Sequence, residues 1–480
     1  MLAIARRLHA PESLVLFATG LLSSFMPGLP PVRVDPNLVL NLFLPPLIYA
    51  STVRVSWHLL RFTLLPGVVL GAALVLITIG AVAVAAGGLL LPGLPWTAAL
   101  LLGVVAAVFD TRLFHEAEGR PHVPRAIADT MKARELVARI AILATYALAL
   151  DAAKSGRFSA WAVLDRYVLD IPAGIVLGGA IGLAIVWARK RIDPAPVEIA
   201  VSVATPYAAA LGAHALDISG VAAITTAALV VSAVRIDRDT GAPISSSETR
   251  VNSTAFWEQA SLMVSSVLFF LAGRALPEAT AALKDWPFWR LAASAAGLLG
   301  IVLAVQFAFS LAATVQEPIR RALDDQRPGS SHLAAAGVMA WASTRSVIAL
   351  VIGLSIPAAL PDGQPFPERD LILVVAALLV VGSVLVQGLS LRAVVSRADL
   401  CEEGEEQREE RAARQAIGEA AAAPRREHAN EFDAARQALL LLRERDRIGD
   451  EVLVRMLRET DLSSRVSEKD ALPGAGPPNP

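Results

Sequence analysis

Long apolar runs are the feature that most constrains this chain, because several of them are long enough to cross a lipid bilayer. A membrane-spanning helix needs about 20 mostly apolar residues. The clearest runs lie at 65–91, 171–187, 292–314 and 371–389. Hydrophobic residues make up 55% of the sequence and charged residues only 18%, against about a quarter in soluble domains. The sequence therefore predicts an all-α polytopic membrane protein.

The order of apolar segments predicts about twelve transmembrane helices. They are expected at 11–28, 36–52, 63–91, 94–114, 132–151, 163–187, 197–216, 218–234, 256–275, 288–314, 332–357 and 369–395. With the N-terminus in the cytoplasm, the inner connections hold roughly twice as many Lys and Arg residues as the outer ones, as the positive-inside rule requires. An even number of spans also places the C-terminus inside. We therefore expect a multi-pass protein of the cell (inner) membrane.

The chain changes character after the last apolar run. Residues 398–471 are rich in Glu, Arg and Ala and keep apolar stripes at helical spacing, which predicts a small cytoplasmic helical tail. Its charge runs are interpreted as solvated helix faces. The segment 472–480 is expected to be a disordered tip, and 1–397 the transmembrane domain.

The first ten residues hold only a short apolar patch before Arg6 and Arg7. They are too few to cross the hydrocarbon core, so we expect a helical stub at the inner interface. Two explanations are open. Either the true start lies upstream of Met1, or the chain has lost a helix.

Several function classes are disfavoured by composition. The net charge is −1, so no field attracts nucleic acid. The single cysteine, Cys401, has no intrachain partner. We find no metal-ligand spacing, Gly-rich phosphate loop or nucleophile arrangement. The sequence therefore predicts no cofactor, no bound metal and no enzymatic activity.

Four stretches, spread over most of the chain, carry a resemblance to a known family. They are Phe43-Leu-Pro-Pro-Leu-Ile-Tyr49; Thr205-Pro-Tyr207 with Ser219-Gly-Val221; Phe256-Trp-Glu258 with Leu268-Phe-Phe-Leu271; and Trp341-Ala-Ser-Thr-Arg345 with Phe366-Pro-Glu-Arg-Asp370 and Val386-Gln-Gly-Leu-Ser390. In this order and spacing they resemble the bacterial sodium/proton exchanger family of the monovalent cation:proton antiporters.

The resemblance implies a fold of inverted helical repeats, in which two discontinuous helices cross near the bilayer midplane. One break is expected at Ala106–Arg112, and the sequence leaves its partner open. The implied partners are a monovalent cation, a proton, the lipid bilayer and a second copy of the chain in a homodimer.

An exchanger of this class needs a carboxylate at membrane depth, for which a proton and a cation compete. The family carries a Glu in its first motif, where this chain has Ala50. The family's Thr-Asp-Pro becomes Phe109-Asp110-Thr111, so the Asp is retained. The Arg expected in the Trp341 motif is present as Arg345.

The largest departures lie in the family's Glu-Gly-Glu-Ser-Leu-Leu-Asn-Asp motif, which aligns without a gap on residues 132–139. The second Glu becomes Arg134 and the Ser becomes Glu135. The Asn becomes Ala138, and the Asp that would bind the ion becomes Arg139. Because an Arg side chain does not release its proton in a protein, Arg139 is expected to act as a fixed internal cation.

Charges inside a membrane are costly, so each is expected to have a partner. Glu135 and Arg139 stand at positions i and i+4 and could pair with each other. Alternatively, Arg345 pairs with Glu135 and Asp110 with Arg139, and we expect this last pair at the helix crossing. A third possibility is that Arg139 reaches the headgroups.

The resemblance therefore implies a secondary transporter similar to monovalent cation (sodium/potassium):proton antiporters, in which the usual ion-binding carboxylates are replaced and the usual exchange is not expected. Within that interpretation, Asp110 and Glu135 form a relocated site, or the Arg cluster favours an anion. The alternative is a non-transporting membrane scaffold or sensor that signals through residues 398–480.

Overall fold

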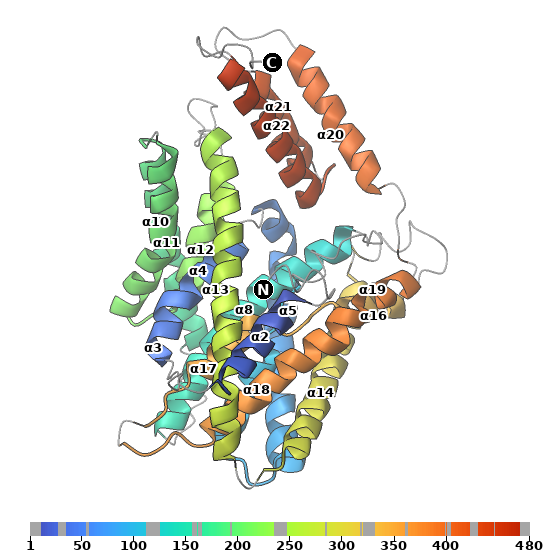
Figure 1. The fold of residues 1–480 in the computed structure, drawn as a ribbon. Coiled ribbons are helices and arrows are strands. Elements are labelled where there is room, and N and C mark those ends of the chain that lie inside the picture. The colour runs from blue at the N-terminus through green and yellow to red at the C-terminus, as the bar shows by residue number, and fades with distance from the viewer. Residues whose placement is uncertain are drawn as a thin grey trace.

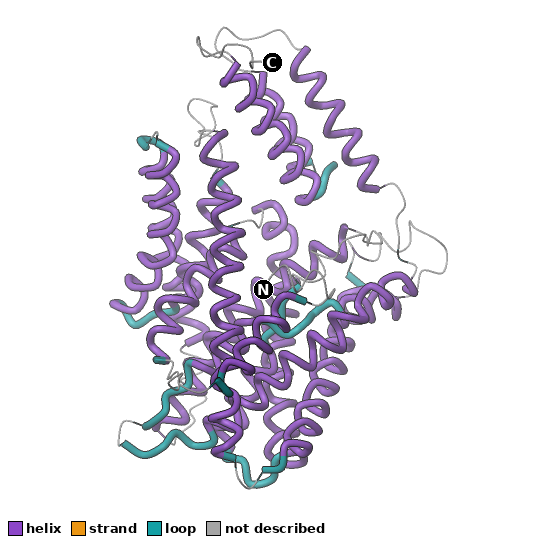
Figure 2. The backbone as a smooth tube through the Cα atoms, in the orientation of Figure 1, coloured by secondary structure: helices purple, strands orange, loops and turns teal. Residues whose placement is uncertain are grey.

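The chain is almost entirely helical (Figures 1 and 2). The computed structural model describes residues 11–26, 35–53, 57–111, 125–155, 161, 166–192, 194–234, 247–283, 286–316, 319, 332–360, 363–398, 400, 405–422, 431–445 and 447–470. Within these residues the β-structure consists of two isolated bridges. The stub at residues 1–10 and the tip at 472–480 lie outside the described residues.

Every predicted span coincides with helical structure. In chain order the elements of the membrane region are α2 (Glu12–Ser23), α3 (Pro36–Leu38), η1 (Val39–Phe43), α4 (Leu44–Thr52), α5 (Trp57–Ala85), η2 (Ala86–Leu90), α6 (Trp96–Ala107), α8 (Arg125–Ser155), η3 (Arg166–Asp170), α10 (Ile171–Arg189), α11 (Ala195–Ala215), α12 (Gly220–Ala233), α13 (Ser247–Ala282), α14 (Phe288–Thr314), α16 (His332–Trp341), α17 (Val347–Leu354), α18 (Arg369–Ser383), η4 (Val384–Gly388) and α19 (Leu389–Ala398). The η elements are π-helical turns.

Seven helical segments of the described chain are long and apolar enough to cross a membrane. Four shorter apolar helices, among them α6 and α16, accompany them. The prediction of an all-α polytopic membrane protein is confirmed. The number of twelve crossings stays a prediction.

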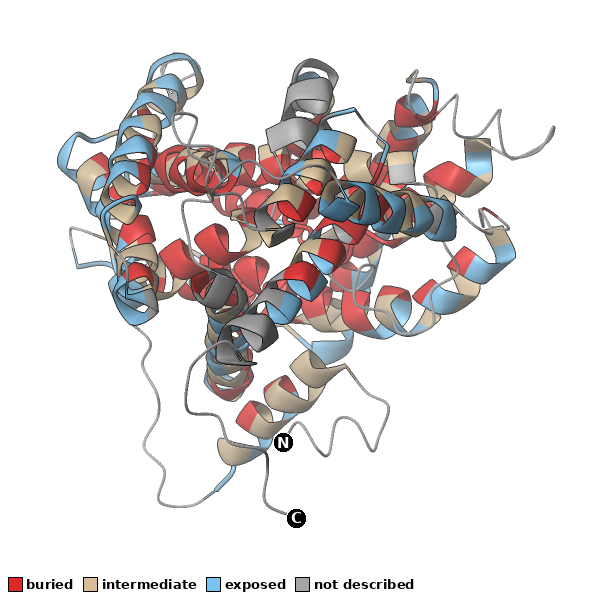
Figure 3. Cartoon of the chain, turned by 90° about the horizontal axis from the view of Figure 1, so that it is seen from above, coloured by how far each residue is buried: buried red, intermediate tan, exposed pale blue. Residues whose placement is uncertain are grey.

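The short helices α6 and α17 lie deep in the bundle, and several long apolar helices lie at its rim. All eight residues of α17 are buried, as are residues 98–107 of α6. At the rim, α10 exposes large apolar side chains, including Val176, Leu183 and Trp187, as expected of a surface that faces lipid. Viewed from above, the buried residues gather in the middle of the molecule (Figure 3).

Glycines allow α10 to pack closely on α12. A Cβ atom at Gly178 would lie 2.2 Å from the backbone oxygen of Ala223, and one at Gly174 would lie 2.4 Å from that of Ser219. Small residues at spacing i, i+4 are a common way for membrane helices to approach each other. Gly174 and Gly178 therefore allow the two helices to pack closely.

Two helices are interrupted at the centre of the bundle. Helix α6 ends at Ala107, and Val108 is already extended; the predicted helix at 94–114 is therefore too long. Helices α16 and α17 are separated by residues 342–346, so the single span predicted at 332–357 is in fact two half-helices. The break expected at Ala106–Arg112 is present, and α16–α17 is the partner that the sequence left open.

The C-terminal tail forms three helices, α20 (Glu405–Ala422), α21 (Glu431–Glu444) and α22 (Asp450–Asp470). Their apolar stripes meet in a cluster of Ala413, Leu439, Ile448, Val452, Leu453 and Met456. The tail also touches the membrane region, because Arg443 lies 3.7 Å from the carboxylate of Asp129 in α8. Figure 1 shows the three tail helices stacked at one end of the bundle.

Candidate functional site at the crossing of two interrupted helices

The two breaks hold each other through their backbones. The N–H of Asp110 donates to the carbonyl of Thr344 at 2.8 Å, and the N–H of Thr344 donates back to the carbonyl of Asp110 at 3.1 Å. Ser346 then caps the start of α17, because its hydroxyl accepts the N–H of Ile348 at 3.1 Å. Broken backbone inside a membrane must find such partners, since no water is there to replace them.

Arg345 satisfies carbonyls that the breaks leave open. Its guanidinium donates to the carbonyl of Ala106 at 2.6 Å and to that of Ser343 at 2.8 Å. A cation at the C-terminal end of α6 is also favourable to the helix dipole. Among the described residues Arg345 has no carboxylate partner, so the predicted pairing of Arg345 with Glu135 is wrong. The guanidinium of Arg345 binds backbone carbonyls at the crossing instead of the carboxylate of Glu135.

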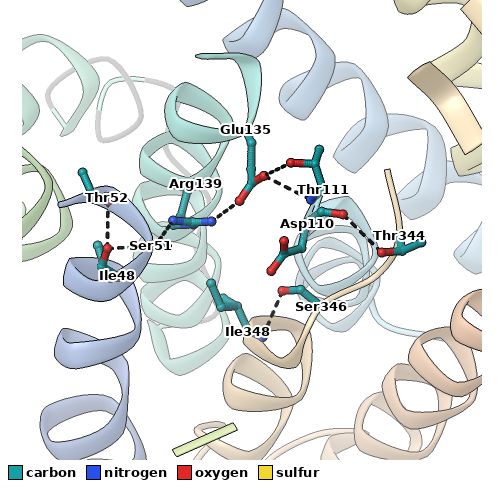
Figure 4. Close-up of polar contacts among 10 residues, drawn as sticks. All are labelled: Ile48, Ser51, Thr52, Asp110, Thr111, Glu135, Arg139, Thr344, Ser346 and Ile348. Atoms are coloured by element: carbon teal, nitrogen blue, oxygen red, sulfur yellow. Dashed lines mark hydrogen bonds and ion pairs between the residues drawn. The ribbon is translucent and has the colours of Figure 1, made fainter. Parts of the chain in front are cut away.

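Glu135 and Arg139 pair with each other on one face of α8 (Figure 4). The other oxygen of Glu135 accepts the N–H of Thr111 at 3.1 Å and its hydroxyl at 2.7 Å. Arg139 donates to the hydroxyl of Ser51 in α4. The sequence left this i, i+4 pair as one of its alternatives, and it is the arrangement that the structure contains.

Arg139 is buried within the protein, with 6% of its surface exposed. It bridges α8 and α4 and does not reach the headgroups. The carboxylate of Asp110 points into the space between the Glu135–Arg139 pair and the start of α17 (Figure 4), and it interacts electrostatically with Glu135. An ion pair between Asp110 and Arg139 stays a prediction.

Arg134 lies on the side of α8 that faces α14 and the α16–α17 break. It donates to the hydroxyl of Ser310 at 3.0 Å and to that of Ser343 at 3.1 Å. Both partners are uncharged. Of the five residues predicted for the ion-site region, Asp110, Glu135 and Arg139 thus share one cluster, while Arg134 and Arg345 meet at Ser343.

The sequence interpretation missed the hydroxyl groups of the site. Ser51, Thr111 and Ser343 each bond to one of the predicted charged residues. Two of them directly follow a position that was singled out, Ala50 or Asp110, and the third lies inside the Trp341 motif. The sequence signal that could have identified these residues was their position next to, or inside, the family-like motifs. Their hydrogen-bond partners were set by helix contacts that no local pattern encodes.

Two of the family-like stretches meet in one aromatic cluster beside Ser202 of α11. The indole N–H of Trp257 donates to the hydroxyl of Ser202 at 2.9 Å, and the hydroxyl of Tyr49 lies 3.5 Å from the same oxygen. The Tyr49 and Trp257 rings pack with their centroids 4.8 Å apart. This cluster fixes α4, which carries Ser51, against α11 and α13.

Proline explains a second bond between these stretches. Pro46 has no N–H to donate to the carbonyl of Leu42, four residues earlier. The hydroxyl of Tyr207 donates to that carbonyl at 3.0 Å instead. The Pro-Pro pair and the Thr-Pro-Tyr sequence therefore complement each other across the helix interface.

The fourth stretch supports the α16–α17 break. The side-chain amide of Gln387 donates to the carbonyl of Trp341 at 2.9 Å, and the indole of Trp341 donates to the hydroxyl of Ser390 at 2.8 Å. Ser383, one turn earlier, accepts the backbone N–H of Arg345 at 2.9 Å. Gln387 lies in the π-helical turn η4, and such turns are frequent at functional sites.

Chemically, the crossing offers two carboxylates, one of them already neutralised by Arg139. In the described part of the chain no group of three or more His, Cys, Asp or Glu residues is arranged to hold a metal ion. The arrangement thus combines fixed cations, hydroxyl groups and two carboxylates in one buried region.

Comparisons with known proteins agree with this architecture. A family model described as "Sodium/hydrogen exchanger, transmembrane" matches residues 1–397. An uncharacterized Na(+)/H(+) exchanger of Mycobacterium tuberculosis is 30% identical over 415 residues, which cover 83% of this chain and 72% of the relative. The low-affinity Na(+)/H(+) antiporter NhaS1 of Synechocystis is 26% identical, over 81% of this chain and 70% of its own length.

A sodium, potassium, lithium and rubidium/H(+) antiporter of Bacillus pumilus is 24% identical, over 79% of this chain and 58% of its own length. Among solved structures, the sodium proton antiporter MjNhaP1 of Methanocaldococcus jannaschii matches with a TM-score of 0.61 at 14% identity, covering 84% of this chain and 95% of that one. That likeness extends to the fold. With the family model across 397 residues, the chain belongs to the sodium/hydrogen exchanger family.

Proposed function

We propose that this protein is a secondary membrane transporter built on the cation:proton antiporter scaffold, in which Arg139 occupies the place of the transported cation. The observation that carries the proposal is the pairing of Arg139 with Glu135 and Ser51. One of the two carboxylates at the crossing, that of Glu135, is thereby held by a permanent charge of the chain itself.

Two features support a block of the usual exchange. Alternating binding requires a site that is emptied and refilled in each cycle, and a tethered guanidinium does not leave. The side chains of Ala50, Ala138 and Arg139 also contain no oxygen atom that could bind a cation. Hard cations need several oxygen ligands to replace their hydration shell, so we expect sodium to bind weakly at this site.

The test is ion flux. The purified full chain is reconstituted in proteoliposomes with a pH-sensitive dye, and a sodium gradient is imposed. The Synechocystis antiporter, prepared in parallel, controls for reconstitution. We expect no sodium-driven proton movement. Robust dequenching that Asp110→Asn abolishes would overturn the proposal and identify Asp110 as a relocated site.

A gain-of-function variant sharpens the same test. Arg139→Asp combined with Ala138→Asn returns two oxygen-bearing side chains to the crossing. We expect sodium to raise the Tm of this variant, since a ligand that binds the folded state stabilises it, and to leave the Tm of the native chain unchanged. Arg139→Ala with Ala138→Asn, which removes the cation without adding a carboxylate, is the matched control.

A second candidate function is favoured by one contact. Arg443 of the tail lies against Asp129 of α8, the helix that carries Glu135 and Arg139. A non-transporting sensor that signals through residues 398–480 would use this connection. Hydrogen exchange on Arg139→Gln distinguishes the two. A sensor predicts altered protection in α21, whereas a blocked transporter predicts changes confined to the crossing.

We further propose an inner-membrane location with both termini in the cytoplasm, on the basis of the Lys and Arg distribution. The homodimer implied by the family stays an expectation. Cysteine labelling at introduced tail positions in intact cells and in inverted vesicles tests the orientation. Labelling of the tail from outside intact cells would contradict it.

A further inference from the structure

The three helices of the C-terminal tail are joined to one another as one packed unit. They share the apolar cluster described above, and polar contacts add to it. The carboxylate of Glu409 in α20 accepts the backbone N–H of Gly449, just before α22, at 2.7 Å. Arg414 of α20 also lies 3.6 Å from the carboxylate of Glu459 in α22. The tail helices are therefore expected to move together.

This unit touches the membrane region at two helices. Helix α22 packs against α13, whose end reaches towards the tail in Figure 1. In addition, the guanidinium of Arg443 in α21 lies 3.7 Å from the carboxylate of Asp129 in α8, and the two side chains are only 4% and 16% exposed. Arg443 also donates to the carbonyl of Ile448 at 3.4 Å. The guanidinium is thus held within the tail while it contacts α8.

Helices α8 and α13 belong to different parts of the bundle. Helix α8 packs on α5, α6 and α12, whereas α13 packs on α2, α4, α11 and α18. Among the described residues no extensive packing joins α8 to α13 directly. The tail, which contacts both, therefore links two helices that are otherwise connected only through their neighbours.

Both helices carry features that the preceding sections identified. Asp129 lies on α8 about two turns before Glu135 and about three turns before Arg139, and the helix is continuous from Arg125 to Ser155. Helix α13 carries Trp257, which bonds to Ser202 of α11. The tail therefore connects the helix of the charged crossing to a helix of the aromatic cluster.

We propose that the tail is an intramolecular clamp that holds α8 in one position relative to α13, with the Arg443–Asp129 pair as its point of release. To move α8 away from the tail, two opposite charges must be separated where little solvent screens them, which costs free energy. The clamp concerns the freedom of two helices to move. It does not depend on whether the chain transports a cation or signals through its tail.

The experiment measures the distance between the two helices in the full chain, reconstituted in lipid nanodiscs. Spin labels are attached at Lys154→Cys in α8 and Gln259→Cys in α13, two exposed positions, and Cys401→Ser removes the native thiol. Pulsed electron paramagnetic resonance gives the distribution of distances. We expect a narrow distribution in this background, and one at least twice as wide when Asp129→Arg or Arg443→Glu is added.

Two controls separate the pair from a general effect of charge. Arg443→Glu combined with Asp129→Arg restores opposite charges in reversed order, and we expect it to return the narrow distribution. Arg411→Glu makes the same change of charge on an exposed position of α20, and it should leave the distribution unchanged.

Asp129→Arg decides the outcome, because it leaves every tail residue as it is, whereas Arg443→Glu alters a side chain buried in the tail. A distribution in Asp129→Arg as narrow as that of the background overturns the proposal, since the tail contact then does not restrain α8. A reversed pair as wide as the single variants overturns it as well, because the loss of pairing would not be the cause of the widening.

Discussion

Two regions of this molecule are held together by different kinds of side chain. Around the aromatic cluster, the uncharged side chains of Tyr49, Tyr207 and Trp257 make hydrogen bonds between helices. At the crossing, by contrast, the charged side chains of Arg139 and Glu135 pair with each other, and Arg139 also donates to Ser51 of α4. Neutral hydrogen bonds join the helices in the first region, and a buried ion pair does so in the second.

The contrast shows that the helix breaks themselves are held mainly through the main chain. Its breaks are closed by backbone bonds between Asp110 and Thr344 and by the side chains of Arg345 and Gln387. These groups bond to main-chain atoms, which are present at every residue whatever its side chain. A change of charge on α8 therefore leaves the scaffold intact, provided that each new charge finds a partner.

The largest expected effect lies in the buried ion pair. Glu135→Ala leaves the guanidinium of Arg139 buried without a carboxylate, and we expect it to lower the free energy of unfolding by about 3–5 kcal/mol. The double variant Glu135→Leu with Arg139→Leu should recover most of this loss, since apolar replacement of a whole buried pair is often neutral. Denaturation of the chain in detergent measures both. A double variant as unstable as the single one would show that the pair is needed for the fold itself.

An intermediate effect is expected in the support of the break. Gln387→Leu removes the donor to the carbonyl of Trp341 and leaves that carbonyl buried, which should cost about 1–3 kcal/mol. Gln415→Leu, on the exposed face of α20, is the matched control and should stay within about 0.5 kcal/mol. Equal effects at both positions would mean that the break is held by its backbone bonds alone.

A smaller effect is expected from Tyr207→Phe. It removes the bond to the carbonyl of Leu42 while keeping the ring, so the loss should be about 0.5–1.5 kcal/mol. Ser266→Ala, which removes an exposed hydroxyl from α13, serves as the comparison. If Tyr207→Phe has no more effect than Ser266→Ala, the complementarity between the Pro-Pro pair and Tyr207 does not contribute to stability.

The smallest effect lies in the tail. A hydrogen bond from Arg414 lowers the pKa of the exposed Glu410 carboxyl from its ordinary value. The folded pKa is the lower one, so this contribution is fully present above the ordinary Glu pKa of about 4.3 and is lost as the pH falls through the folded value. Solvent screening keeps it small. Tail unfolding at pH 6 and pH 3, compared between the native chain and Glu410→Gln, should differ slightly at pH 6 and converge at pH 3.

Much of the architecture was predictable because it follows from local composition. Apolar run length predicted the helical segments, and the charged composition after residue 398 predicted the helical tail. The break near Asp110 followed from the resemblance. The length of α6 was not predictable, because nothing in the sequence Ala106-Ala107-Val108 disfavours a helix. The chain leaves the helix there because Asp110 bonds to Thr344, more than two hundred residues away.

The sequence by itself determined which charges enter the bundle: it placed three guanidinium groups and two carboxylates at membrane depth, whatever their partners. Only the tertiary structure decided the pairing. Arg345 donates to carbonyls at the helix breaks, Glu135 accepts hydrogen bonds from Arg139 and Thr111, and Arg134 donates to hydroxyl groups. The physical reason is that a buried charge takes whichever oxygen the packing brings within reach, and that packing is set by contacts between helices far apart in the chain.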